Sequence, residues 1–175
     1  MGADTKRDGG PNPSAGVSPP RMRFLRPVGV TAWDSDVAAP RILVAEDDDE
    51  VRRFLVALLR GDGYDVVEAE DGRALLEALA RQLEERVDPI DLIISDLRMP
   101  DINGLEVLGC LQRAEWKTPF ILVTAFGSES ITNEALRRGA AAIFDKPFDV
   151  DRLRSEIVRC VGRRRASVTP SPRES

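Results

Sequence analysis

Short strand-like runs alternate with segments of helical periodicity between residues 41 and 161. The runs are ILVA, YDVVEAE, DLIIS, FILVT and AAIFD. After ILVA, for example, Val51, Phe54 and Leu55 share one face of a helix, and similar apolar faces follow the other runs. Strands of this kind suit a parallel sheet that helices cover on both faces. The pattern predicts an α/β fold, a doubly wound five-stranded parallel sheet with five helices.

Polar side chains stand where four of these runs end. They are Glu46 and Asp47 after the first run, Asp96 after the third, Thr124 at the end of the fourth and Lys146 after the fifth. In an open parallel sheet all the strands end along one edge, and the ligand crevice lies there. We therefore expect three carboxylates, a hydroxyl and an ammonium in one pocket.

The residue types in this pocket suit metal-assisted phosphoryl chemistry. The carboxylates of Glu46, Asp47 and Asp96 are the hard oxygen ligands that Mg²⁺ prefers. Asp96, on the middle strand, would attack phosphorus and form an acyl phosphate. The metal, Lys146 and Thr124 would each meet an oxygen of the phosphoryl group in the transition state.

Each of these residues also has a purely structural interpretation. The run EDDDE (46–50) suits a solvated helix start, with Asp48 or Asp49 as N-cap, because the helix dipole favours carboxylates there. Asp96 alone would cap a loop, and Lys146 alone would be a surface lysine. The functional interpretation is favoured because the polar residues recur in register, at one strand end after another.

Composition excludes several other functions. The chain contains no histidine, which rules out histidine catalysis, a histidine zinc site or a phosphohistidine relay within it. Residues 41–161 carry 25 acidic and 16 basic side chains, which argues against direct nucleic-acid binding by the folded part. No apolar run is long enough to span a membrane, and the N-terminus lacks the basic-then-apolar pattern of a signal peptide. We therefore expect no membrane contact and a cytoplasmic location.

The two ends of the chain differ from its middle. Residues 1–39 are rich in Gly and Pro at the start and show no sustained period, which predicts a disordered or loosely attached extension. Residues 163–175 are basic and then rich in Ser and Pro, which predicts a disordered tail. The folded domain is therefore expected to span residues 40–162.

Four segments of this domain resemble the receiver domain of bacterial two-component response regulators, in the order found in that family. The segments are RILVAEDDDEVRRFL (41–55), DLIISDLRMPDINGLEVL (91–108), FILVTAFGS (120–128) and AAIFDKPFD (141–149). In style they are most similar to receivers of the nitrogen-regulator and nitrogen-fixation types. The resemblance implies a flavodoxin-like fold with strand order 2-1-3-4-5.

The resemblance also implies a role for each polar residue. Asp96 would be the phosphoacceptor, and Mg²⁺ would bind at Asp96, Asp47, Glu46 acting through water, and the backbone carbonyl of Arg98. Further expectations are that Thr124 and Lys146 bind the phosphoryl oxygens and that the Lys146–Pro147 peptide is cis.

The partners that the resemblance implies are proteins. The phosphoryl group would come from a sensor histidine kinase or a histidine phosphotransfer protein. We expect a stand-alone receiver, a signalling domain without an enzymatic output, whose phosphorylation switches a protein-binding face. The last two helices and the last strand would form that face, which would bind an unknown downstream protein or a second copy of the chain.

Two departures from the family pattern bear on the switch and on helix length. An aromatic residue is common three positions before the lysine, but here that position is Ile143. Strand alternation should point the neighbouring Phe144 to the other face of the sheet. We therefore expect a smaller rearrangement on phosphorylation, or one carried by the helix that follows Thr124. The segment RQLEERVD is expected to extend the second helix by more than a turn.

Two other functions fit part of the pattern. A receiver-like scaffold that is never phosphorylated would keep the same fold. A phosphatase that forms an aspartyl phosphate would use a D-x-D motif after the first strand, which the run from Asp47 to Asp49 satisfies. That alternative leaves Asp96 without a role and lacks a substrate-selecting cap.

Overall fold

Five parallel strands form one sheet in the part of the chain described by the computed structural model, residues 38–85, 88–125 and 127–168. The strand order is β2-β1-β3-β4-β5, which confirms the predicted topology. The strands are β1 Arg41–Ala45, β2 Asp65–Ala69, β3 Leu92–Asp96, β4 Phe120–Thr124 and β5 Ala142–Asp145. The helices are α1 Asp49–Gly61, α2 Gly72–Glu85, α3 Gly104–Arg113, α4 Glu129–Arg137 and α5 Val150–Val168.

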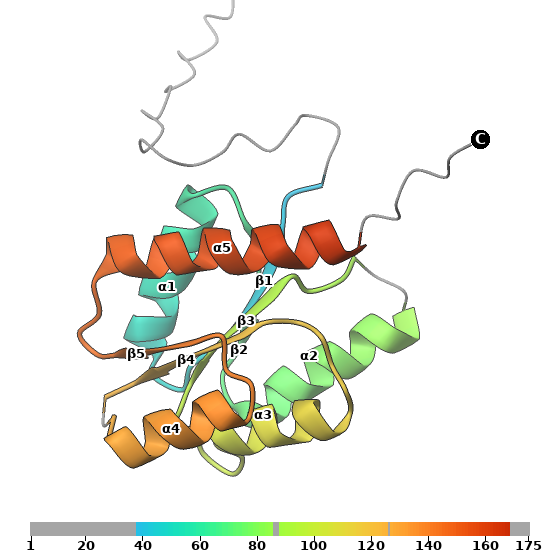
Figure 1. Cartoon of the computed structure of the whole chain (residues 1–175). Coiled ribbons are helices and arrows are strands. Elements are labelled where there is room, and N and C mark those ends of the chain that lie inside the picture. The colour runs from blue at the N-terminus through green and yellow to red at the C-terminus, as the bar shows by residue number, and fades with distance from the viewer. Residues whose placement is uncertain (1–37, 86–87, 126, 169–175) are drawn as a thin grey trace, which may run out of the picture.

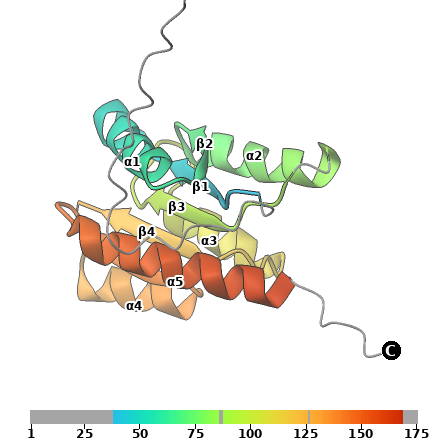
Figure 2. The same ribbon diagram turned by 90° about the horizontal axis from the view of Figure 1, so that it is seen from above.

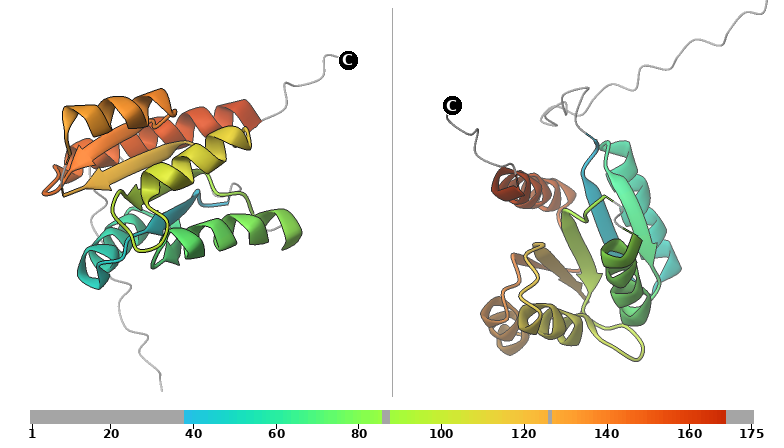
Figure 3. Two further views of the ribbon diagram at one scale, coloured as in Figure 1. Left: turned by 90° about the horizontal axis from the view of Figure 1, so that it is seen from below. Right: turned by 90° about the vertical axis from the view of Figure 1, so that its right-hand side faces the viewer.

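The helices form two layers, one on each face of the sheet. Helices α1 and α5 cover one face, and α2, α3 and α4 cover the other (Figures 1 and 3). All five residues of β3 and of β4 are buried, whereas the edge strands β2 and β5 are partly exposed. The unbroken apolar runs of the central strands follow from this double cover.

Short polar signals in the sequence set the helix ends. The Asp48 carboxylate accepts hydrogen bonds from the backbone N–H groups of Glu50 and Val51, so Asp48 is the N-cap of α1. Asn103 caps α3 in a capping box: its side-chain oxygen accepts from the Glu106 N–H, and its own backbone N–H donates to the Glu106 carboxylate. The cap at Asp48 starts α1 next to Glu46 and Asp47, and the cap at Asn103 starts α3 at the end of the loop that follows Asp96.

Helix α5 does not stop at the domain boundary expected at residue 162 but continues to Val168. In its last turns Arg165 forms an ion pair of 3.2 Å with the buried carboxylate of Asp91, just before β3. The last turns of α5 lie beside the edge at which the strands begin (Figures 1 and 2). Residues 1–37 and 169–175, on which the other predictions about the chain ends fall, lie outside the described residues.

Helix α2 runs to Glu85, which confirms its expected extension up to that residue. Residues 86–87, the end of the predicted extension, lie outside the described part. None of the helices in the described residues is both long and apolar enough to span a bilayer.

Candidate functional site

The strand ends bring the predicted polar residues together at one edge of the sheet. Glu46 follows β1, which pairs with β3 up to Ala45 and Ser95, so Glu46 lies beside Asp96. Glu46 is 1% exposed and Asp96 is 5% exposed, whereas Asp47 is exposed to solvent. The site is therefore open on one side and closed against the core on the other.

Three carboxylates form the acidic part of the site. One oxygen from each of Glu46, Asp47 and Asp96 lies within 4.8 Å of the other two. Carboxylates at this separation repel one another, and a divalent cation with a preference for oxygen ligands relieves the repulsion. The residues present therefore fit Mg²⁺, as the sequence pattern predicts.

Lys146 supplies the positive charge that faces these carboxylates. Its Nζ donates to Glu46 Oε2 at 2.7 Å and lies 2.8 Å from Asp96 Oδ1. The backbone N–H of Lys146 donates to the Thr124 carbonyl at 2.7 Å, which fixes the chain after β5 to the end of β4. The peptide between Lys146 and Pro147 is cis, as expected.

These contacts change the proton affinities of two groups. Burial raises the pKa of Glu46, and the neighbouring Asp96 carboxylate raises it further, against the opposing effect of the Lys146 ammonium. Burial alone would lower the pKa of Lys146, but its hydrogen bonds with Asp96 and Glu46 outweigh burial and the pKa is raised. Lys146 therefore stays a cation.

The loop after β3 holds the other oxygen of Asp96. The backbone N–H of Arg98 donates to Asp96 Oδ2 at 2.5 Å. The Arg98 backbone thus lies beside the carboxylate, in the neighbourhood expected of it. Thr124, at the end of β4, is 1% exposed and takes its predicted place among the strand ends.

Two residues that sequence reasoning missed also shape the site. Arg52 on α1 donates from one guanidinium nitrogen to the Glu46 carbonyl at 2.6 Å and forms an ion pair with Asp49 through another. A Cβ at Gly104 would lie 2.3 Å from the Asp96 carbonyl oxygen, so only glycine fits where α3 meets β3. The sequence offered one signal for each residue. Arg52 lies one turn into the helix after the acidic run, and Gly104 ends the run DING (101–104).

Fold and site together define a class of protein, the flavodoxin-like α/β domains with acidic residues at the strand ends. The sequence model of the response regulator receiver domain matches residues 42–158. The chain belongs to this family, which makes it a two-component signalling domain.

Three similar proteins illustrate the relationship. Regulatory protein AtoC of Escherichia coli K12 is 36% identical over 124 residues, covering 71% of this chain and 26% of AtoC. The KDP operon transcriptional regulatory protein KdpE of the same strain is 38% identical over 133 residues, covering 75% of this chain and 55% of KdpE. The solved receiver domain of Francisella response regulator 1452 superposes with a TM-score of 0.64 at 28% identity, covering 71% of this chain and 98% of that domain.

The chain spans between about a quarter and about half of the length of these two curated relatives. That this receiver acts without an attached output domain therefore stays a prediction.

Proposed function

We propose that the chain is a phosphorylation-controlled binding switch, in which Asp96 accepts a phosphoryl group in the presence of Mg²⁺. One observation carries this proposal. The Asp96 carboxylate is held between Lys146 Nζ and the Arg98 N–H, within 4.8 Å of oxygens from Glu46 and Asp47.

Glu46, Asp47, Asp96 and the Arg98 carbonyl would hold the ion, which when bound would offset the charge of the carboxylates and of the phosphoryl oxygens. An Asp96 oxygen attacks the phosphorus of a phosphohistidine and the P–N bond breaks. The electron pair of that bond stays on the ring nitrogen, and the imidazole leaves neutral with the proton that its other nitrogen already carries. Lys146 and the Thr124 hydroxyl bind phosphoryl oxygens in the product.

The donor in this proposal is a sensor histidine kinase or a histidine phosphotransfer protein, because receiver domains accept phosphoryl groups from sensor histidine kinases. The face made by α4, β5 and α5 would carry the output, to a downstream protein or a second copy of the chain. Leu136 is half exposed there, and Arg137 pairs with Glu134 beside it. Mixed charge around an apolar residue supports a salt-sensitive protein contact.

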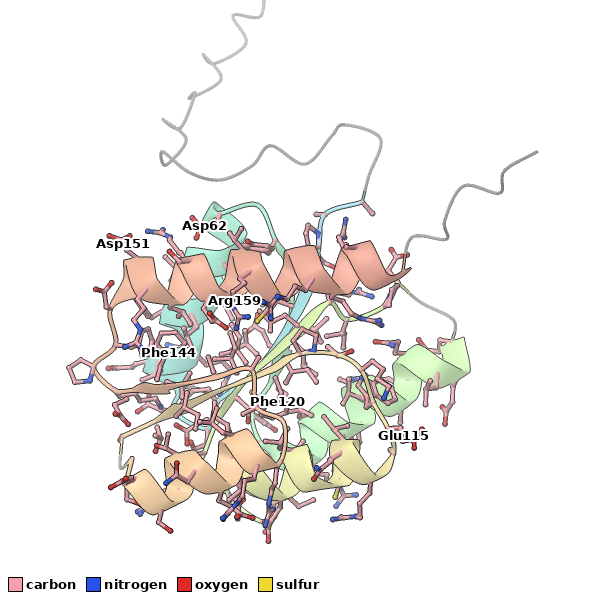
Figure 4. All side chains as sticks on the ribbon, viewed as in Figure 1. Asp62, Glu115, Phe120, Phe144, Asp151 and Arg159 are labelled. Atoms are coloured by element: carbon pink, nitrogen blue, oxygen red, sulfur yellow. The ribbon has the colours of Figure 1, made fainter. Side chains whose placement is uncertain are left out.

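The two residues before Asp145 support the expectation of a smaller switch. Ile143 packs partly buried on the α2–α4 side of the sheet. Phe144 is buried on the α1–α5 side, where the Arg152 guanidinium lies 5.4 Å from the ring centroid (Figure 4). Ile143 has no aromatic ring, and the Phe144 ring lies on the opposite face of the sheet. Neither residue therefore supplies an aromatic ring that turns between the surface and the space beside Thr124.

The test uses beryllofluoride, which mimics a phosphoryl group on aspartate, together with Mg²⁺ and amide NMR. We expect saturable, Mg²⁺-dependent shifts around the strand ends that disappear in Asp96→Asn. Mg²⁺ binding without a beryllofluoride response would instead favour the scaffold that is never phosphorylated. An Ile143→Tyr variant should show larger shifts in β5 and α5 than the wild type.

The phosphatase alternative has less support from the contacts. Asp48 is committed to capping α1, and Asp49, the second acid of the D-x-D motif, pairs with Arg52 and Arg53. Turnover of p-nitrophenyl phosphate would nevertheless revive it.

A further inference from the structure

A cavity of about 300 Å³ lies at the edge of the sheet where the strands begin, opposite to the carboxylates. It sits between the segment that leads into β4, the residue before β5 and the C-terminal half of α5. Four of its lining residues are cations, namely Lys117, Arg159, Arg163 and Arg164. Pro119, Ala141 and Cys160 supply its uncharged surface.

The packing of α5 explains why these cations gather. Arg159 and Arg163 stand four residues apart and so share one face of the helix. Arg159 reaches toward the sheet, and its guanidinium donates to the Ala141 carbonyl at 3.4 Å (Figure 4). The ion pair between Arg165 and Asp91 holds the last turns of α5 against the same edge, with Arg165 itself pointing to β3.

The lining of the cavity is cationic although the whole chain carries a net charge of −5. The described residues that line it include these four cations and no acidic side chain. Glu156, which is not among the lining residues, forms an ion pair with Arg159. An anionic ligand in the cavity would therefore meet several cations at once.

The shape and the residue types of the cavity point to a phosphate-bearing ligand. Guanidinium groups bind phosphate through two parallel hydrogen bonds, and an ammonium adds a mobile point charge. A volume of about 300 Å³ falls at the small end of ligand pockets, which suits a small molecule better than a protein segment. We propose that this cavity binds a small polyphosphate anion, either free or as the phosphate end of a nucleotide.

Calorimetry and amide NMR on the full chain test this proposal, with pyrophosphate, ATP and adenosine as probes. The buffer contains a chelator instead of Mg²⁺, so that the carboxylate site repels the two anionic probes, pyrophosphate and ATP. We expect pyrophosphate and ATP to bind saturably, with shifts at residues 117–120, 141–142 and 159–164, and with affinity that falls as salt rises. Adenosine distinguishes a free polyphosphate from a nucleotide as the ligand. Binding of adenosine, together with tighter binding of ATP than of pyrophosphate, identifies a nucleotide.

A double variant, Lys117→Glu with Arg163→Glu, should weaken pyrophosphate binding at least about tenfold through lost charge-assisted hydrogen bonds. Its matched control is Arg53→Glu with Arg73→Glu, which changes the net charge equally at arginines whose side chains are 74% and 76% exposed. The control should bind within about twofold of the wild type. Amide NMR spectra with the peak dispersion of the wild type show that each variant is folded, and Arg163→Gln replaces the double variant if that one does not fold.

Three results would overturn the proposal. The first is the absence of saturable pyrophosphate binding, and binding of an Asp- and Glu-rich peptide in that case would identify an acidic peptide as the ligand. The others are equal weakening in both double variants and shifts that map away from the cavity. A failure of the Asp96 switch would leave these readouts unchanged, since the cavity and the carboxylates lie at opposite edges of the sheet.

Discussion

In the absence of metal, the Lys146 ammonium is expected to stabilise the folded domain by offsetting the charge of the buried carboxylates. The variant Lys146→Met tests this through its free energy of unfolding. The ammonium lies 2.7 Å from Glu46 Oε2 and 2.8 Å from Asp96 Oδ1, and both carboxylates are almost fully buried. Removing one partner of a buried ion pair leaves uncompensated charge and destabilises a protein by about 3–5 kcal/mol. The site is open on the side of Asp47, so water reaches the carboxylates and we expect the low end of that range, about 3 kcal/mol.

A change of this size is a large share of the stability of a small domain, which is typically about 5–15 kcal/mol. For a domain of this length it corresponds to a fall in melting temperature of roughly 10 °C. Urea and thermal unfolding of the wild type and of Lys146→Met in chelator give the difference directly. Lys146→Arg keeps a cation in place and should lose less, and Lys117→Met, at an exposed lysine, should change little.

Addition of Mg²⁺ supplies the second half of the test. Because the variant lacks the cation that faces the three carboxylates, Mg²⁺ should stabilise it more than it stabilises the wild type. The reasoning is refuted if Lys146→Met loses less than about 1 kcal/mol, or if Mg²⁺ stabilises both proteins equally.

Three further predictions concern other parts of the domain. Gly104→Ala should lower the free energy of unfolding by about 2–3 kcal/mol in urea, because its Cβ would meet the Asp96 carbonyl oxygen at 2.3 Å. Asp91→Asn keeps an acceptor but removes the charge that faces Arg165, so hydrogen exchange in residues 163–168 should become faster. Burial raises the pKa of the Cys160 thiol to about 11. From about pH 7 to about pH 9 it should therefore stay protonated and react with a disulfide reagent only after urea is added.

The predictions for Gly104→Ala and Asp91→Asn each have a matched control. Gly162→Ala, at a helical glycine whose added Cβ would meet nothing within 4 Å, should be neutral or stabilising. Asp65→Asn, at a half-exposed carboxylate paired with Arg41, should leave exchange at the end of α5 unchanged. Equal losses for Gly104→Ala and Gly162→Ala, or a Cys160 that reacts at once in the native domain, would contradict the packing described above.

The periodicity of the chain was enough to predict the sheet, its helices and the edge that carries the polar residues. Strands β3 and β4 are buried on both faces, so their composition is apolar throughout and their ends are sharply marked. The start of helix α1 could be predicted as well, because its N-cap, Asp48, lies among acidic residues that favour a helix start.

The end of α5 could not be predicted in the same way. An arginine-rich run followed by Ser and Pro has the composition of a solvated tail, and nothing local in it indicates a helix. Arg165 in the last turns of the helix pairs with Asp91, 74 positions earlier in the chain, and local sequence does not indicate a contact at that separation.

The sequence by itself therefore determined the fold class, the strand order through family resemblance, and which polar residues meet at the strand ends. Tertiary structure decided how they meet: Lys146 bridges Glu46 and Asp96, and Arg52 binds the Glu46 carbonyl. It also decided that cations from α5 and from the approach to β4 line one cavity. The physical reason is that periodicity encodes which side of an element is buried, whereas distances between side chains far apart in sequence depend on how the elements pack.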